Sequence, residues 1–460
     1  MRLWSDTRIE LAGPVAAYSA HVSIEVEGDC SNESRVRVFQ YQPFPVPFSG
    51  EGNPLPLALA VDDVGRVWMM EEFHINSFRM LDPIRGRVEN LFYPRHPDPG
   101  GFASTILGQD FETHLSALGE SVLVDPRGRV WSAQGGGHFY NGKYANRSRI
   151  VCCLPDALPA ERYRIYDVPG TNNRVMGLAW DPFRERIWFA ASGAIGPGGS
   201  NVVRFDPEGI PYDDEFDCSR LLLDQVCRAG EPESECYRVY PVRSGSGPAH
   251  LAVDASGYVW VTCYWGRAIS RLDPQDGQVI EYPLPEPINR SWQARLVGPG
   301  PWELRFDEEG DLLFNEFYDC TISLFDVDRA TDPACCALDR DGSNPCLTDW
   351  VMPGRNLDAH RIHSIEYAND GCLWFTEFSP EESGVNPGLG FMTEDRSEMV
   401  RLPPLDRFGE RTAAGAMGIG VDRKTGDIWI AEFWRKRITR LWELRARSSL
   451  RTPAVVCVED

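Results

Sequence analysis

The sequence predicts an all-β chain folded as a seven-bladed β-propeller of four-stranded antiparallel blades, and three observations carry this prediction. A short phrase returns seven times: apolar residues, a polar turn that ends in glycine, then two apolar residues, usually including tryptophan. Third and fourth apolar segments follow most copies of the phrase. Each unit is too small to bury its own apolar faces, so the units must pack on one another. Seven repeats of four short strands describe such a propeller.

Each copy of the phrase predicts a β-hairpin, because two apolar stretches flank an Asp-x-x-Gly type of turn. The seven copies occupy residues 60–68, 124–131, 179–188, 253–260, 306–313, 367–374 and 421–429. Third strands often end in Asp-Pro, as at 78–83, 203–207 and 269–274. Fourth strands typically end in proline, as at 165–169, 237–241 and 279–283. Proline suits an outer edge strand because it lacks a backbone donor.

The two ends of the chain are expected to close the ring together. The last repeat has a third strand near residues 437–441 but no obvious fourth, whereas residues 38–43 resemble the fourth strand of the other units. We therefore expect this N-terminal strand to complete the last blade. The propeller domain is predicted over residues 36–445, after an N-terminal extension at 1–35 and before a C-terminal tail at 446–460.

The charge balance restricts the partners. The 460 residues include 46 Lys and Arg against 68 Asp and Glu, a net charge of -22. Such a chain repels phosphate backbones and anionic lipid, so neither nucleic acid nor a membrane is an expected partner. No apolar run approaches the ~20 residues that span a bilayer. We expect a soluble monomer that binds a small-molecule or peptide-like ligand at the mouth of its channel.

Two loop insertions are rich in cysteine. They contain Cys218, Cys227 and Cys236 in one case, and Cys335, Cys336 and Cys346 in the other. Loop cysteines of this kind predict disulfides formed in an oxidising compartment, which favours an extracellular or periplasmic site; reduced surface thiols are the alternative. The apolar stretch at 11–20 is not a convincing signal peptide, since Asp6 and Glu10 lie where basic residues belong.

His363 breaks the repeat. In a symmetric hairpin that turns at Asp370, residues equally distant from the turn face each other, so His363 is expected opposite Glu377. This position marks the open end of the innermost strands, at the channel mouth. The equivalent residues in the other hairpins are Leu57, Glu120, Met176, Ala249, Trp302 and Met417. Because histidine occurs there once, His363 is the candidate catalytic residue; a partly buried histidine bonded to a carboxylate without catalysis is the alternative.

Glutamate recurs at the hairpin position that is expected to face His363 or its equivalent. It is found in four hairpins, as Glu71, Glu316, Glu377 and Glu432. Four carboxylates around one channel mouth would favour a hard cation bound through oxygen, with Mg²⁺ the first choice and Ca²⁺ the second. Glu377, Glu316 and Glu432 are the candidate metal ligands. Alternatively, each glutamate satisfies backbone donors between blades.

The repeat resembles that of a known family. The segments at 371–377 and 277–285 are similar to the repeat unit of the virginiamycin B lyase (streptogramin lyase) family, and the likeness extends over about residues 36–441. The resemblance implies a seven-bladed propeller that opens streptogramin rings by magnesium-dependent elimination. It also implies roles for His363 and Glu377. The family's second histidine and its further metal-binding glutamate correspond to Trp302 and Arg361, which supply neither a base nor a metal ligand.

Three functions are compatible with the sequence. The first is metal-assisted elimination from an ester or cyclic depsipeptide, with His363 taking the proton α to a carbonyl polarised by a metal on Glu377. The second is a non-catalytic binding propeller with an apolar floor that includes Trp302 and Met417. The third is a metal-dependent lactonase or hydrolase. The candidate ligand-binding residues are Trp302, Arg361, His360, His250, Met417 and Glu71.

Overall fold

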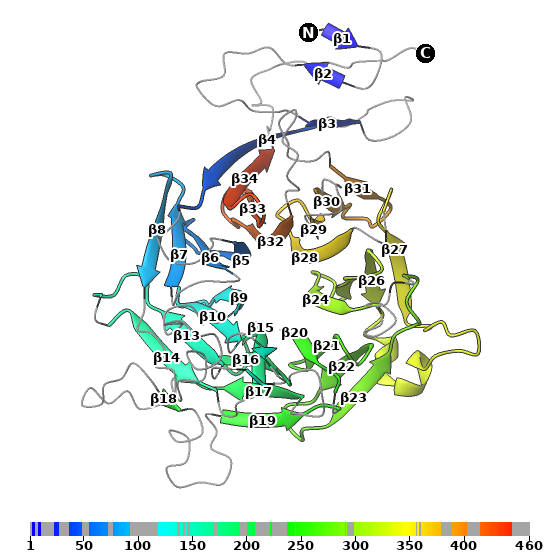
Figure 1. Cartoon of the computed structure of the whole chain (residues 1–460). Coiled ribbons are helices and arrows are strands. Elements are labelled where there is room, and N and C mark those ends of the chain that lie inside the picture. Colours follow the sequence, from blue (N-terminus) through cyan, green and yellow to red (C-terminus); the bar gives the residue numbers. More distant parts are fainter. Residues whose placement is uncertain are drawn as a thin grey trace.

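Seven β-sheets surround a central opening, as the sequence predicts (Figure 1). The structure is a computed structural model. It describes residues 2–4, 8–10, 23–26, 36–47, 55–71, 77–92, 118–135, 139–140, 143–144, 148–159, 161–168, 173–193, 200–207, 221–222, 237–243, 245–289, 291, 299–355, 357, 360–378, 388–402 and 415–443. The innermost strand of each sheet borders the opening, so each sheet is a propeller blade.

The first three blades contain one predicted hairpin each. Blade 1 comprises β5 (Pro56–Val61), β6 (Val67–Glu71), β7 (Ser77–Asp82) and β8 (Arg87–Phe92). Blade 2 comprises β9 (Leu118–Val124), β10 (Val130–Gly135), β13 (Arg149–Cys153) and β14 (Tyr163–Asp167), and β18 (Leu221–Leu222) adds a parallel edge strand. Blade 3 comprises β15 (Asn173–Asp181), β16 (Arg186–Gly193), β17 (Asn201–Phe205) and β19 (Tyr237–Pro241).

The next three blades follow the same order. Blade 4 comprises β20 (Pro248–Val253), β21 (Val259–Cys263), β22 (Ala268–Leu272) and β23 (Val279–Pro283). Blade 5 comprises β24 (Pro301–Phe306), β25 (Leu312–Glu316), β26 (Thr321–Phe325) and β27 (Leu347–Val351). Blade 6 comprises β28 (Arg361–Tyr367), β29 (Leu373–Phe378), β30 (Leu389–Met392) and β31 (Met399–Arg401).

Blade 7 joins the two chain ends and confirms the predicted closure. Its strands β32 (Ala416–Val421), β33 (Ile428–Glu432) and β34 (Arg437–Glu443) are followed by β4 (Val36–Pro45). Strand β34 pairs antiparallel with β4 over seven residue pairs, from Arg437↔Pro45 to Glu443↔Phe39. Strand β3 (Ser23–Val26), from the predicted N-terminal extension, pairs with β4 as a fifth strand. Farther out, β1 (Arg2–Trp4) pairs with β2 (Arg8–Glu10). The predicted tail at 446–460 lies outside the described residues.

The recurring acidic residue explains the repeated phrase. In blade 1, Asp62 accepts the backbone N–H groups of Val64 and Arg66 at 3.1 and 2.9 Å, which closes the hairpin turn. Its second oxygen accepts the indole N–H of Trp68 at 2.8 Å. The same indole bond joins Trp131 to Asp125, Trp188 to Asp181 and Trp260 to Asp254. One carboxylate thus caps the turn and satisfies a buried indole donor, which would otherwise cost free energy.

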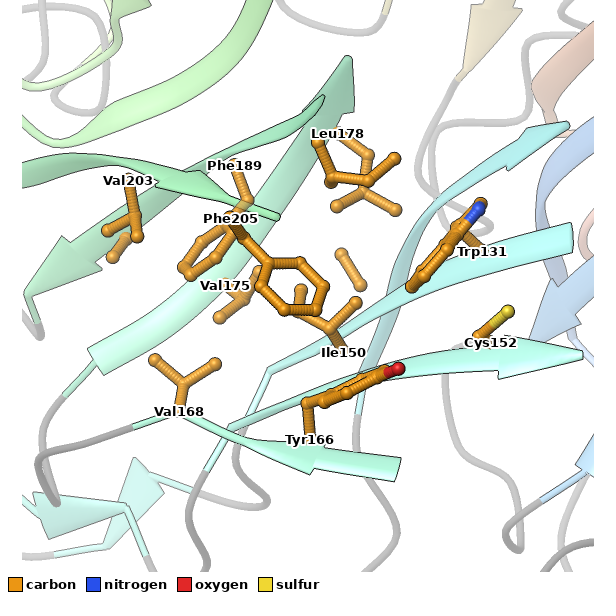
Figure 2. Close-up of a cluster of buried hydrophobic side chains, with 13 residues drawn as sticks. Trp131, Ile150, Cys152, Tyr166, Val168, Val175, Leu178, Phe189, Val203 and Phe205 are labelled. Carbon is orange, nitrogen blue, oxygen red and sulfur yellow. The ribbon is translucent and has the colours of Figure 1, made fainter. Parts of the chain in front are cut away.

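The apolar core lies between neighbouring blades. Between blades 2 and 3, Trp131, Ile150 and Tyr166 meet side chains from β15, β16 and β17 (Figure 2). The rings of Tyr166 and Phe205 are 4.8 Å apart in an edge-to-face arrangement. Both side chains are almost completely buried. Each blade therefore buries its faces against the next, as a repeat architecture requires.

The second cysteine-rich insertion contains a disulfide. Cys336 and Cys346 are bonded, beside the short 3₁₀ helices η2 (Arg329–Thr331) and η3 (Pro333–Cys336). Cys335 is a free, exposed thiol, so the predicted staple forms with two of the three cysteines. The other insertion cysteines, Cys218, Cys227 and Cys236, lie outside the described residues. Among the described residues, no helix is long and apolar enough to cross a bilayer.

Candidate functional site at the channel mouth

The central channel is a cavity of about 500 Å³ lined by the first strands of all seven blades. On much of its wall the lining is apolar or glycine, as with Leu59, Leu178 and Gly418. Blades 4, 5 and 6 differ, because they present His250, Glu303 and Ser364 to the cavity. These three side chains are buried. With Arg305 and Glu366, most polar lining residues therefore lie on blades 4 to 6, and Ser121 of blade 2 and Arg423 of blade 7 are the others.

A β-bulge places His363 away from Glu377. Ile362 pairs with Glu377 and Ile365 pairs with Phe375, so His363 and Ser364 together lie opposite one residue of β29. The expectation that His363 faces Glu377 is therefore wrong. A bulge adds a residue to one strand and shifts the register beyond it, which a symmetric hairpin does not anticipate.

The same shift recurs in other first strands. The unpaired residues are Met176 and Gly177 in β15, Ala249 and His250 in β20, Trp302 and Glu303 in β24, and Met417 and Gly418 in β32. The second residue of the pair lines the channel in blades 4 to 7, as His250, Glu303, Ser364 and Gly418. The bulge thus separates the channel wall from the residues that precede it.

Polar side chains on the second strands hold three of these bulges. Thr262, Asn315 and Thr376 accept the N–H of His250, Glu303 and Ser364 at 3.0, 2.9 and 3.0 Å. They also donate to a carbonyl of the next blade, at Trp302, Ile362 and Met417, over 2.6 to 2.8 Å. Sequence reasoning missed these three residues. They were detectable from the sequence, because they are polar whereas the equivalent residues in the other four blades are apolar: Met70, Ala133, Ala190 and Ala431.

His363 is held as a neutral imidazole with a defined tautomer. Its Nδ1 lies 3.1 Å from the carbonyl oxygen of Met417 and 3.3 Å from Oγ of Ser364. A carbonyl can only accept, so Nδ1 carries the proton and Nε2 keeps a lone pair. No described residue bonds to Nε2. Burial lowers the pKa of His363 to about 4, although the charge of Glu303 opposes this shift. At neutral pH, Nε2 is therefore an acceptor.

Trp302 lies between two histidines. Its ring centroid is 5.1 Å from that of His250 and 5.8 Å from that of His363. Tyr264 and Phe317 complete the aromatic surroundings at 5.4 and 6.2 Å. Nε1 of Trp302 and Nε2 of His250 are buried, and neither has a hydrogen-bond partner among the described residues. Burial, followed by the charge of Arg305, lowers the pKa of His250 to about 3. Buried polar atoms usually have a hydrogen-bond partner in folded proteins, so these two atoms can take a bound molecule or water as that partner.

Two further tryptophan rings, those of Trp265 and Trp434, lie directly on glycines. A Cβ atom at Gly247 would come within 2.0 Å of the Trp265 ring, and one at Gly415 within 2.3 Å of the Trp434 ring. Both glycines have positive φ angles, of 59° and 52°. Met417, also predicted at the site, packs nearby with Leu57 and Phe433. Met417 and Trp302 pack in different apolar clusters, so the apolar floor stays a prediction.

The four glutamates predicted at the channel mouth bond instead to the third or fourth strand of their own blades. Three of them form an ion pair with an arginine: Glu71 with Arg79 at 2.8 Å, Glu377 with Arg401 at 2.6 Å and Glu432 with Arg437 at 2.8 Å. The fourth, Glu316, accepts a hydrogen bond from Thr321 at 2.6 Å. The expected ring of carboxylates is therefore not formed. None of the four is among the residues that line the channel.

The predicted metal ligands do not fit one shared cation. Glu316, Glu377 and Glu432 lie in three blades, and each is already bonded within its own sheet. Within the part of the chain that the structure describes, no group of three His, Cys, Asp or Glu residues is arranged to hold a metal ion. The divalent cation stays a prediction without assigned ligands.

The side chains of Arg361 and His360 contact Leu357, Tyr318 and Arg401 rather than His363. Arg361 donates to the carbonyls of Leu357 and His360 at 2.8 and 2.5 Å. Its guanidinium lies 5.1 Å from the ring centroid of Tyr318. Burial, followed by the charge of Arg401, lowers the pKa of His360 to about 4. Both residues are buried, which favours a packing role. Of the predicted residues, the structure brings together His363, Trp302, His250 and the carbonyl of Met417.

No protein-family profile matches the chain. Among curated proteins, regucalcin from Xenopus laevis is 28% identical over 95 residues, which cover 20% of this chain and 31% of regucalcin. The chain thus matches about a third of that relative's length.

Solved structures resemble the chain over most of its length. A streptogramin B lyase superposes with a TM-score of 0.58 at 17% identity, covering 88% of this chain and 98% of the lyase. Virginiamycin B lyase from Staphylococcus aureus gives 0.55 at 18%, with 88% and 99% covered. The β-propeller domain of Cps50 (Swd1) from Myceliophteria thermophila gives 0.50 at 13%, with 87% and 99% covered. At these identities the likeness establishes the fold. This chain is a seven-bladed β-propeller with the fold of the virginiamycin B lyases.

Proposed function

We propose that this protein binds an ester- or amide-containing small molecule over Trp302 at the channel mouth, and that His363 removes a proton from it in a lyase-type elimination. The observation that carries the proposal is the state of His363. Its Nδ1 proton is engaged by the Met417 carbonyl at 3.1 Å, and a pKa of about 4 keeps the ring neutral. Nε2 is therefore ready to accept a proton at neutral pH.

The surroundings suit a ligand that contains a carbonyl. The aromatic rings around Trp302 offer flat apolar contacts, and the buried indole N–H is a donor without a partner among the described residues. In the proposed step, Nε2 of His363 takes the proton α to the carbonyl. The C–H electron pair forms a C=C bond while the C–O bond to the β-oxygen breaks, and the leaving group departs as a carboxylate. No external oxidant or nucleophile is required.

The structural relatives support this choice of reaction. One of them is a catalytically inactive histidine-to-alanine variant of virginiamycin B lyase from Staphylococcus aureus, solved with quinupristin at 17% identity to this chain. In that protein a histidine is required for activity. Here the corresponding candidate is His363, whose Nε2 has no hydrogen-bond partner among the described residues. The step is written without a metal, because Glu316, Glu377 and Glu432 do not fit one.

A mass-spectrometric assay tests the proposal. The full chain is incubated with quinupristin and with a panel of cyclic depsipeptides, with and without a chelator. Elimination opens a ring without changing its mass, whereas hydrolysis adds one water. We expect ring opening at constant mass, reduced about 10²- to 10⁴-fold in His363→Ala. Calorimetry should show that this variant still binds.

Each other outcome has a distinct meaning. Binding without turnover in the unchanged protein would favour the non-catalytic propeller. A product heavier by one water would favour the hydrolase. Activity lost to the chelator and restored by Mg²⁺ would show that a metal acts at ligands other than the three glutamates. An unchanged rate in His363→Ala would overturn the proposed role of this residue.

A further inference from the structure

Ser364 and Glu303 connect His363 to the channel. Oγ of Ser364 donates to Oε1 of Glu303 at 2.9 Å and lies 3.3 Å from Nδ1 of His363. A carboxylate can only accept, so the hydroxyl proton is directed to Glu303. The Ser364 oxygen therefore offers a lone pair to the Nδ1 proton. The three side chains form one continuous hydrogen-bonded chain.

The far end of this chain faces the cavity. Glu303 and Ser364 both line the channel of about 500 Å³. The second oxygen of Glu303 accepts from the backbone N–H of Ile365 at 3.1 Å and lies 3.3 Å from Nη2 of Arg305. Arg305 is anchored in turn to Glu366 at 2.9 Å. The carboxylate is thus held in place at the channel wall, across the boundary between blades 5 and 6.

We propose that His363, Ser364 and Glu303 form a proton relay that exchanges protons between the ligand site and the channel. The relay rests on the proposed function, because it supplies a route for the proton that Nε2 accepts. When Nε2 gains a proton, Nδ1 gives its own to Ser364 while the hydroxyl proton passes to Glu303. Glu303 then releases that proton to water in the channel. One proton enters and one leaves.

The bond to Met417 resets the relay. After the transfer, Nδ1 is unprotonated and faces a carbonyl oxygen 3.1 Å away, an arrangement of two acceptors. The original tautomer returns when Nε2 gives its proton to the departing product or to solvent and Nδ1 recovers one through Ser364. The Met417 carbonyl therefore favours one resting state without preventing the transfer.

Three substitutions separate a relay from simple packing. Glu303→Gln keeps an oxygen that accepts from Ser364 but cannot take up a proton. Ser364→Ala removes the hydroxyl, whereas Ser364→Thr retains it. Exchange of the Nδ1 proton of His363 with water is measured by NMR on the full chain labelled with ¹⁵N-histidine at about pH 7, with His363→Ala to assign the signal. We expect exchange to slow about tenfold or more in Glu303→Gln and Ser364→Ala, and to stay close to the original rate in Ser364→Thr.

The controls keep the relay distinct from the proposed function. In the unchanged protein the Glu303 carboxylate stabilises the imidazolium of His363, so Glu303→Gln should also lower the pKa of His363 further. A melting curve checks that each variant folds. An unchanged exchange rate in folded Glu303→Gln would overturn the relay. If turnover depends on His363 but the exchange rate of its Nδ1 proton is the same with and without Glu303, the relay is refuted and the proposed function stands. If exchange depends on Glu303 but no ligand is turned over, the function fails and the proton path stands.

Discussion

Replacing Glu316 by glutamine should stabilise the protein at alkaline pH. Glu316 accepts from the hydroxyl of Thr321 and, among the described residues, is the one of the four recurring glutamates that has no arginine partner. It is 6% exposed. Burial, and then the charge of Asp349, raises its pKa from 4.5 to about 8, and Asp319 contributes in the same direction. A buried carboxyl without a cation is expected to hold its proton at neutral pH.

The size of the effect follows from proton linkage. The folded-state pKa lies above the unfolded value, so the contribution of Glu316 is fully present below 4.5 and is lost as pH rises to about 8. The loss amounts to about 1.4 kcal/mol per pH unit within that window. Glutamine does not titrate. The variant should therefore nearly match the original protein near pH 5 and exceed its stability at pH 9 by up to about 5 kcal/mol, which is the slope multiplied by the distance between the two pKa values.

Denaturant unfolding of both proteins at pH 5, 7 and 9 measures this difference. Comparing the two proteins at each pH cancels the other groups that titrate in the range, such as Glu71, whose pKa burial raises to about 7. Glu377→Gln is the matched control. It breaks the buried ion pair with Arg401, so it should destabilise the protein at pH 7, by about 3–5 kcal/mol. Equal destabilisation of Glu316→Gln at pH 5 and pH 9 would refute the reasoning.

Three further predictions concern closure and the site. Deleting residues 36–45 removes the strand that pairs with β34, so the ring should open and cooperative melting should be lost; unchanged melting would exclude the latch. Turnover should be flat from about pH 6 to 8 and fall as pH drops through about 4, because protonation of His363 removes its lone pair; a rate that survives below that pH would contradict this. Thr376→Val loses the bonds to Ser364 and Met417, which should cost about 1–3 kcal/mol in unfolding free energy. Ala431→Val, at the equivalent place in blade 7, is its control; equal losses would indicate packing alone.

The blades and their closure were predictable because their determinants are local. A polar turn that ends in glycine, apolar alternation and a terminal proline each act within a few residues, and seven copies of the same pattern leave little ambiguity. The missing fourth strand of the last repeat and the spare strand near the N-terminus were visible for the same reason. His363, Trp302 and Arg361 also stood out, since each departs from the repeat or from the family that it resembles.

The partners of those residues depended on contacts between blades. Thr376 bonds to the bulge of its own blade and also to the Met417 carbonyl of the next blade. The bulge sets a register in which Ile362 lies opposite Glu377. A one-residue shift changes which side chains share a face, so the predicted pair of His363 and Glu377 was not formed. The sequence by itself determined a closed seven-bladed ring and the blades that differ from the rest. Tertiary structure alone decided that His363 contacts Ser364 and that Glu377 contacts Arg401, because both pairings depend on how the strands are packed.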